Sequence, residues 1–193
     1  LMGSILSMAL PLAANRLVIS LLQSAEAVLI PGSLRAFGLS GEEALSLYGI
    51  LTGMALPFIF FPTALTGSLS VMLLPHIAAA QSEASYESIS RSSRLSIRFS
   101  LYVGVLAAGL FLRFGASIGP AVFHNETAGE LLTVLAWLCP FLYVSGTLGS
   151  IINGLGYVKV TFLHNVLSLG IRLAFVTLMI PRIGMRGYLY GLL

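Results

Sequence analysis

The stretch LPLAANRLVISLLQSAEAVLIP, Leu10–Pro31, is apolar over most of its length, yet it contains Asn15, Arg16, Gln23 and Glu26. About 20 predominantly apolar residues are enough for a helix to cross the hydrocarbon core of a bilayer. With about 100° between successive residues, the four polar side chains fall on one side of that helix. The stretch therefore predicts a membrane-spanning helix whose polar side faces a protein interior that water can enter.

The composition of the whole chain agrees with a membrane protein. Of its 193 residues, 57% are hydrophobic and 9% are charged, and the mean hydropathy is +0.96. Soluble domains carry roughly 25% charged residues, so the deficit indicates a polytopic, all-α membrane protein rather than one ordinary soluble domain. The net charge is only +3, and the 10 Lys and Arg residues form no basic stripe with interleaved aromatics. Nucleic acid is therefore not an expected partner.

Apolar segments recur along the chain and are separated by polar connections. We predict a single transmembrane helical bundle over residues 1–193, with five full spans and one partial span. Their approximate bounds are 4–30, 44–80, 95–118, 131–152 and 160–180, with the partial span at 185–193. The polar segment QSEASYESISRSSR, 81–94, is expected to be a loop or a short surface helix. The partial span at 185–193 is shorter than the roughly 20 residues that a span needs. We therefore expect the chain to be a piece of a longer protein that is cut at both ends.

The long second span contains three prolines, Pro57, Pro62 and Pro75. Proline removes a backbone hydrogen bond and kinks a helix, and in a membrane the freed carbonyl needs a partner or a water-lined cavity. We interpret Pro57 and Pro62 as a candidate conformational hinge. A static kink that only improves packing is the alternative that the sequence leaves open.

Two local patterns predict how helices begin and how they pack. Ser40 precedes Glu42 and Glu43, which is typical of a helix start. GxxxG matches occur in GILTG, GASIG and GYLYG, at 49–53, 115–119 and 187–191. Such motifs suit close helix packing, although chance matches are common in glycine-rich membrane chains.

The fifth span repeats the design of the first. Its polar residues form one stripe about 100° wide on a helix and are Thr161, His164, Asn165, Ser168 and Arg172. Arg172 lies near the middle of its span, as Arg16 does. A mid-membrane arginine costs about 2.5–3.5 kcal/mol on insertion scales, and its planar fork suits a phosphate or a carboxylate. The two arginines therefore predict a central cavity that binds an anionic group of a transported substrate.

The other polar residues of the two stripes are predicted to line that cavity, namely Asn15, Gln23, Glu26, His164 and Asn165. Glu26 or His164 also has the chemistry to carry a coupling proton. The alternative role for the arginines is structural pairing. Arg16 and Glu26 lie about 15 Å apart along a helix axis, which is too far for them to pair well. A structural role for Arg16 would therefore require a partner on another helix.

The sequence has none of the motifs that mark a catalytic site. It lacks a nucleophile elbow, a phosphate-binding loop, HExxH and a pair of carboxylates with catalytic spacing. Cys139 is the only cysteine, which excludes an intramolecular disulfide and a CxxC metal pair. The chain is therefore not expected to be an enzyme, and neither a cofactor nor a metal is expected.

Two stretches carry a resemblance to a known family. NRLVISLLQSAEAVLIPGSL begins at Asn15, and EALSLYGILTGMALPFIFFPTALTGSLSVMLLPHIAAA ends at Ala80. Both are similar to the stage V sporulation protein B family, polysaccharide biosynthesis (transport) proteins of the MATE-like multidrug/oligosaccharidyl-lipid/polysaccharide (MOP) flippase superfamily. The pieces LTGMALP, FPTALT and MLLP are the most specific, and the resemblance is looser after Arg94.

The resemblance implies two six-helix bundles around a central cavity, which work by alternating access. This chain would be the second bundle, about helices 7 to 12 of a 12–14-helix transporter, and the first bundle of the same longer chain would be its partner. The loop that carries Arg91, Arg94 and Arg98 would be cytoplasmic. Related flippases of lipid-linked peptidoglycan precursors hold a pyrophosphate with cavity arginines, and the resemblance transfers this role to Arg16 and Arg172.

These points together predict a flippase or exporter in the cytoplasmic membrane of a bacterium. Its substrate would be a lipid-linked anionic envelope precursor, a peptidoglycan or oligosaccharide intermediate, with spore cortex synthesis as one setting. That precursor and the lipid bilayer are the expected partners. A MATE-type multidrug or cation exporter is the alternative within the same fold, although its cavity would need acidic residues. A non-transporting membrane scaffold for envelope-synthesis enzymes is the alternative of another class.

Overall fold

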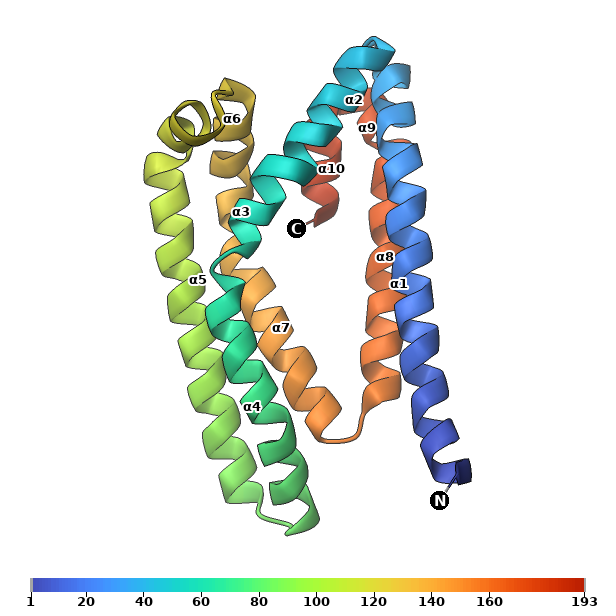
Figure 1. The fold of residues 1–193 in the computed structure, drawn as a ribbon, viewed down its shortest axis with the longest axis vertical. Coiled ribbons are helices and arrows are strands. Elements are labelled where there is room, and N and C mark those ends of the chain that lie inside the picture. Colours follow the sequence, from blue (N-terminus) through green and yellow to red (C-terminus); the bar gives the residue numbers. More distant parts are fainter. Residues whose placement is uncertain (1, 193) are drawn as a thin grey trace. The chain divides into compact units, whose positions relative to one another are not determined.

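The regular structure of this chain is entirely helical within residues 2–192, the part that the computed structural model describes; for residues 2–16 and Leu22 only the backbone is described. The first half contains α1 (Met2–Phe37), α2 (Gly41–Ile50), the π-helical η1 (Leu51–Ala55), α3 (Leu56–Phe60) and α4 (Thr63–Ser82). The second half contains α5 (Tyr86–Phe123), α6 (Glu126–Leu135), the 3-10 turn η2 (Ala136–Leu138), α7 (Cys139–Gly154), α8 (Val158–Leu178), α9 (Ile180–Ile183) and α10 (Met185–Leu192). Figure 1 traces these helices along the chain.

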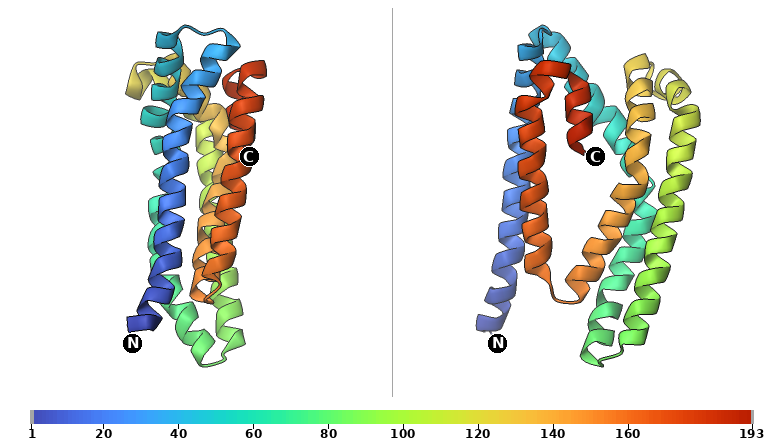
Figure 2. Two further views of the ribbon diagram at one scale, coloured as in Figure 1. Left: turned by 90° about the vertical axis from the view of Figure 1, so that its right-hand side faces the viewer. Right: turned by 180° about the vertical axis from the view of Figure 1, so that it is seen from behind.

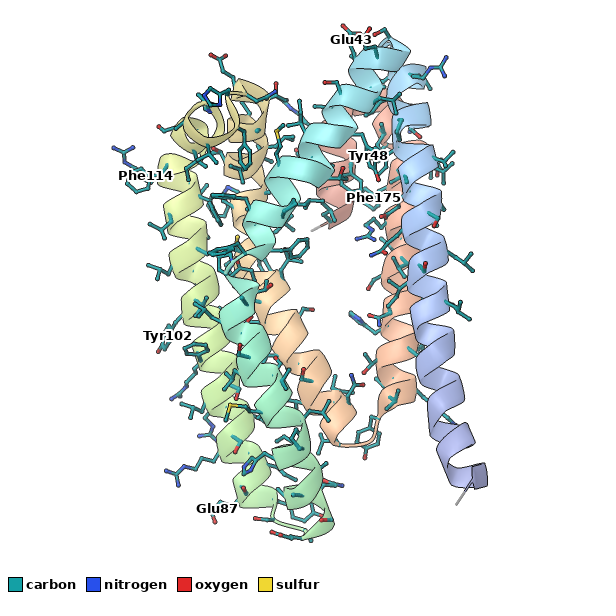
Figure 3. The ribbon with its side chains drawn as sticks, viewed as in Figure 1. Glu43, Tyr48, Glu87, Tyr102, Phe114 and Phe175 are labelled. Carbon is teal, nitrogen blue, oxygen red and sulfur yellow. The ribbon has the colours of Figure 1, made fainter. Side chains whose placement is uncertain are left out.

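Six stretches of the described residues are long and apolar enough to cross a membrane. They are 17–37, 41–60, 63–82, 86–123, 126–154 and 158–178. Large apolar side chains lie exposed along them, as expected for surfaces that meet lipid. Tyr102 is 69% exposed and Phe114 is 48% exposed, and both project outward from α5 (Figure 3). The helices confirm the predicted all-α, polytopic membrane bundle.

The chain divides into two compact units. One consists of residues 1–48 and 158–193, and the other of residues 49–157. One boundary between the two units lies within α2, and the other lies at the turn before α8. The expectation of one bundle over the whole chain stays a prediction.

The unit of residues 49–157 is built around α5, which packs against α4, α6 and α7 (Figure 2). Glycines allow the close approach to α6. A Cβ atom on Gly115 would lie 2.7 Å from Thr133 Oγ1, and one on Gly119 would lie 2.5 Å from Gly129 Cα. The packing predicted for GASIG is therefore confirmed, since larger residues would push the two helices apart.

The predicted second span, 44–80, is broken at Phe61–Pro62. Pro62 has no N–H to donate to the Phe58 carbonyl, which instead accepts from the Phe61 N–H at 3.3 Å in a tighter turn. The span therefore becomes two helical stretches, 41–60 and 63–82. Because α3 lies beside α6 and α4 lies beside α7, the chain keeps its direction through the break. Pro75, in contrast, lies inside α4 without ending it.

Several helices extend further than the sequence pattern indicates. Of the predicted connection 81–94, a loop or a short surface helix, only the turn before Tyr86 is not helical, and Ala84 adopts a positive φ of 53° there. Residues 86–94 are helical, but as the first part of α5 rather than as a separate short helix. Residues 86–94 contain neither Gly nor Pro, so nothing stops α5 from forming as soon as the turn ends. At the other end, α5 continues to Phe123, and Asn125 caps α6 by accepting the Ala128 N–H at 3.0 Å. Polarity places a segment outside the membrane, but it does not prevent a helix.

The first connection also differs from expectation, because α1 continues through Pro31 to Phe37. The predicted start of the next helix is confirmed by a reciprocal cap. Ser40 N–H donates to Glu43 Oε2 at 2.8 Å, and Glu43 N–H donates to Ser40 Oγ at 3.2 Å. This capping box satisfies two amide donors that the start of α2 leaves without helical partners.

The unit of residues 1–48 and 158–193 is organised around α8, which packs against α1 and α10. The glycines of GYLYG allow α10 to fold back onto α8. A Cβ atom on Gly187 would lie 2.7 Å from the carbonyl carbon of Met179, and one on Gly191 would lie 2.7 Å from Phe175 Cβ. In the unit of residues 49–157, by contrast, no described atom lies within 4 Å of a Cβ built on Gly49 or Gly53, so GILTG makes no such contact.

Candidate functional site

The central feature of the first unit is an ion pair between two membrane helices. Glu26 on α1 and Arg172 on α8 meet where these helices run side by side (Figures 1 and 2), with Arg172 Nε against Glu26 Oε1. The Glu26 side chain is 9% exposed and that of Arg172 is 25% exposed. Two residues that the sequence places in separate polar stripes are thus brought together by the packing of α1 on α8.

The pair explains how two charges lie inside apolar helices. A single charged side chain at the centre of a bilayer is unfavourable by about 2.5–3.5 kcal/mol on insertion scales. Each partner offsets the charge of the other, and a pair with good geometry recovers much of the desolvation cost. Glu26 and Arg172 therefore need no separate route to water to offset their charges.

Arg172 has bonding capacity beyond this pair. A guanidinium carries five N–H donors in a planar fork, and the contact with Glu26 engages it at Nε. The side chain also keeps a quarter of its surface exposed. The arrangement can therefore bind a second anion, or exchange Glu26 for one.

Two tyrosines complete the surroundings of the pair, and the sequence analysis missed both. Tyr48 on α2 and Tyr188 on α10 lie close enough to Glu26 for its carboxylate charge to act on their hydroxyl groups. Tyr188 also lies within the electrostatic reach of Arg172 and is only 4% exposed. Figure 3 marks Tyr48 on its helix. Four helices of one unit thus contribute to the site.

One signal in the sequence pointed to Tyr188. It lies between the two glycines of GYLYG, which bring α10 against α8, and it therefore approaches the helix that carries Arg172. No comparable signal marked Tyr48, because its position depends on how the chain turns after α1.

The other predicted cavity residues are distributed along the same helices. Gln23 lies one turn before Glu26 on α1 and is exposed. His164, about 12 Å before Arg172 along α8, is also exposed, and Asn165 is half-buried. The side chains of Asn15 and Arg16 lie outside the described residues, so their predicted roles stay predictions.

A metal site is not formed by the described residues. No group of three or more His, Cys, Asp or Glu side chains gathers among them. Glu26 is also the only one of the seven acidic residues that lies far from a helix end or from its first two turns. The candidate site is therefore one arginine, one carboxylate and two tyrosines.

The second unit contains the predicted hinge, and its freed carbonyls have donors. Tyr143 Oη donates to the Ile59 carbonyl at 2.7 Å, and Thr63 Oγ1 donates to the Phe60 carbonyl at 2.5 Å. Tyr143 is 1% exposed. Pro57 lies in the first turn of α3, directly after the π-helical turn η1. These bonds let the chain bend at Pro62 inside a membrane without leaving these carbonyls unsatisfied. A hinge and a static kink both require such bonds, so the two alternatives stay open.

Comparisons with known proteins found two distant relatives. Over 164 residues, 85% of this chain, it is 29% identical to sporulation protein YkvU of Bacillus subtilis (strain 168), of which the match covers 37%. Over 185 residues, 95% of this chain, it is 22% identical to stage V sporulation protein B of the same strain, of which the match covers 36%. The chain thus spans little more than a third of the length of these relatives.

The two other comparisons found no match, either to a protein-family model or to a solved structure. The two relatives support distant homology to sporulation-associated proteins, and the helices fit a membrane protein. The resemblance to the wider flippase superfamily remains a prediction.

Proposed function

We propose that this chain is part of a flippase or exporter that moves a lipid-linked anionic envelope precursor across the cytoplasmic membrane of a bacterium. The observation that carries the proposal is the Glu26–Arg172 pair in two apolar helices. A guanidinium held within the membrane by a single carboxylate is suited to receive a phosphate or pyrophosphate. The substrate would be a peptidoglycan or polysaccharide intermediate, and the two relatives, both sporulation proteins by name, make sporulation one setting.

In this proposal Glu26 competes with the substrate for Arg172. When a phosphate binds the guanidinium, the Glu26 carboxylate loses its partner and faces a second negative charge. It is then stabilised by taking up a proton from solution. Release of the substrate restores the ion pair, which would prevent the anion from binding irreversibly.

Alternating access requires movement of helices around such a site. We assign the bend at Pro57 and Pro62 to this movement, together with a first bundle contributed by the same longer chain. Binding near the midplane, at the interface of two repeats, is a general pattern of secondary transporters. The chain would bind and translocate its substrate without a cofactor, a metal or a catalytic step.

The cation-exporter alternative is less well supported. A site for a cationic drug would need an accessible carboxylate, whereas the Glu26 side chain is only 9% exposed and the guanidinium side of the pair, Arg172, is 25% exposed. The scaffold alternative makes a different prediction, because a scaffold does not need a cationic group inside its helices.

The test is translocation of a lipid-linked precursor by the full-length protein in vesicles. Arg172→Ala should abolish transport, and Arg172→Lys should restore part of it, since lysine keeps the charge but not the planar fork. Arg186→Ala, an exposed arginine in the same unit, is the matched control. Unchanged transport by correctly inserted Arg172→Ala protein would reject an anion site at Arg172 and favour the scaffold.

A second variant tests the competition directly. Glu26→Gln keeps the size of the side chain and removes the competing charge, so the precursor should bind more tightly. Weaker binding by folded Glu26→Gln protein would show that Glu26 does not oppose the anion.

A further inference from the structure

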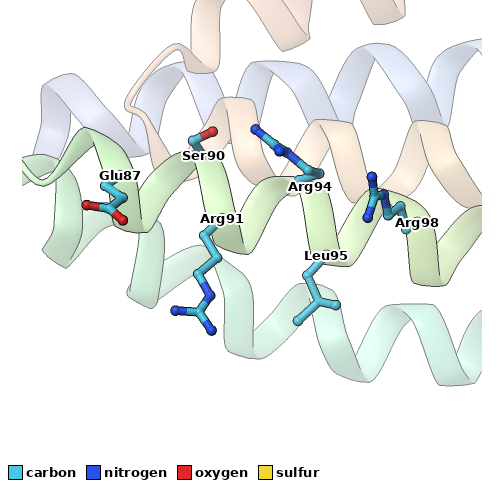
Figure 4. Close-up of a pocket in the computed structure, with 6 residues that line it drawn as sticks. All are labelled: Glu87, Ser90, Arg91, Arg94, Leu95 and Arg98. Carbon is cyan, nitrogen blue, oxygen red and sulfur yellow. The ribbon is translucent and has the colours of Figure 1, made fainter.

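Three arginines form a basic face at the start of α5, in the second unit. Arg91, Arg94 and Arg98 lie on successive turns and fall within about 60° of one another around the helix. They line a surface hollow of about 490 Å³ together with Glu87, Ser90 and Leu95 (Figure 4). Three guanidinium groups around one carboxylate give this hollow an excess of positive charge.

These arginines are available to bind a ligand. All three are exposed, and among the described residues none has an ion pair with a carboxylate or another partner. This distinguishes them from Arg172, which is paired with Glu26. The basic face therefore has unused capacity for an anion.

An apolar groove begins where the basic face ends. The groove has a volume of about 320 Å³ and lies between α4 and α5, lined by Leu69, Met72, Leu73, His76, Ser92, Leu95 and Ser96. Leu95 lines both hollows, and in Figure 4 it points to the side of α5 on which α4 runs. Leu95 is 70% exposed and Met72 is 73% exposed. A basic hollow thus adjoins a mainly apolar groove, and Leu95 lines both.

The height of the basic face fits a membrane interface. From Arg98 to Phe123, the end of α5, the helix extends about 38 Å, enough to cross a hydrocarbon core of about 30 Å. The arginines then lie at the level of the lipid headgroups, where basic side chains attract anionic lipid. The groove between α4 and α5 starts at the same level.

We propose that this face binds an anionic glycerophospholipid of the surrounding bilayer, with its phosphate among Arg91, Arg94 and Arg98 and an acyl chain in the groove beside Leu95 and Met72. The charge of the hollow selects an anionic headgroup over a zwitterionic one. The apolar groove selects a lipid over a free anion. This site is separate from the Glu26–Arg172 pair and does not depend on the proposed transport function.

The experiment measures lipid binding to the full protein in detergent by native mass spectrometry. The probes are short-chain phosphatidylglycerol, short-chain phosphatidylcholine and glycerol phosphate. We expect phosphatidylglycerol to bind, and the other two to bind at least tenfold more weakly. Equal binding of phosphatidylcholine would overturn the role of the arginines. Equal binding of glycerol phosphate would overturn the role of the groove.

Variants assign the binding to this face. R91Q/R94Q/R98Q should weaken phosphatidylglycerol binding by roughly fivefold for each arginine removed. R91K/R94K/R98K should retain most of it, because the charge is kept. The matched control, R113Q/R182Q/R186Q, removes the same charge from three exposed arginines elsewhere and should leave binding unchanged. An equal loss in the control would reduce the effect to net charge and reject the site.

A groove variant separates the two halves of the site. L95S/M72S should weaken phosphatidylglycerol binding without altering the weak binding of glycerol phosphate. Unchanged phosphatidylglycerol binding in this variant would reject the acyl chain position. Transport assays of the same variants are independent, so a transport-inactive protein that still binds phosphatidylglycerol would contradict only the proposed function.

Discussion

The energetic coupling between Glu26 and Arg172 is the most direct quantity that the structure predicts. Removing one member of a buried ion pair typically costs about 3–5 kcal/mol, because the other charge is left without a partner. Glu26 is 9% exposed and Arg172 is 25% exposed, so the two single variants should differ. Arg172→Met leaves the more buried charge unpaired and should cost about 4 kcal/mol. Glu26→Gln leaves Arg172 unpaired. The arginine side chain is long enough to extend its charge toward water, so this variant should cost about 2 kcal/mol.

The double variant gives the coupling itself. E26Q/R172M removes both charges together, so its loss of stability should be smaller than the sum of the single losses. For residues in direct contact the expected difference is about 3 kcal/mol, the upper end of the usual 0.5–3 kcal/mol, so the double variant should lose less stability than Arg172→Met alone. The measurement is equilibrium unfolding of the full protein in mixed micelles, followed by helical circular dichroism, at constant pH and salt.

Arg186→Met is the control, because Arg186 is exposed in the same unit and its loss should change stability by less than about 0.5 kcal/mol. Additive losses, with a coupling below about 0.5 kcal/mol, would refute the claim that Glu26 and Arg172 offset each other's charge.

Acidification provides a second check. Protonation of Glu26 removes the unpaired charge in Arg172→Met, so the defect of this variant should shrink as the pH falls.

Three further predictions concern the helix break, the packing glycines and the capping box. Tyr143→Phe removes the donor to the Ile59 carbonyl and should cost about 1–3 kcal/mol in the unfolding assay; no change would mean that the carbonyl does not need the hydroxyl. Gly119→Ala places a Cβ against the backbone of α6 and should destabilise by more than about 2 kcal/mol, whereas Gly109→Ala on the same helix meets nothing within 4 Å and should stabilise by up to about 1 kcal/mol; equal effects in thermal unfolding would refute the close packing. Ser40→Ala removes the capping hydroxyl and should cost about 1 kcal/mol, measured by the same unfolding assay.

The helical class of the protein and its membrane character could be predicted from composition and apolar segment length. Composition and apolar segment length are properties of the linear sequence, so these two predictions do not depend on how the helices pack. The start of α2 was equally predictable, because the Ser40–Glu43 capping box involves only residues three apart. Helix ends were less predictable. Residues 86–94 are helical because polarity alone does not disrupt helical hydrogen bonds, and α1 continues through Pro31 to Phe37.

The composition of the candidate site was only partly predictable. The helical periodicity singled out Glu26 and Arg172 separately, but their pairing requires α1 and α8 to lie at one particular rotation and height. Tyr48 and Tyr188 enter the site from α2 and α10, neither of which carries one of the two polar stripes read from the sequence. GxxxG spacing predicted close packing at GASIG and GYLYG but not its absence at Gly49 and Gly53, because a flat helix surface is used only where a partner helix arrives.

The sequence by itself determined that this chain forms apolar helices with charged residues at their centres. Local hydrogen bonding and hydrophobic length are sufficient for that result, because both act between residues that are close in the chain. Only the tertiary structure decided that Arg172 is matched by Glu26, that Tyr143 satisfies the carbonyl of Ile59, and that Leu95 joins a basic hollow to an apolar groove. Each of these contacts joins distant parts of the chain or depends on which helix packs beside it, and such contacts are selected by side-chain packing and charge neutralisation once the helices meet.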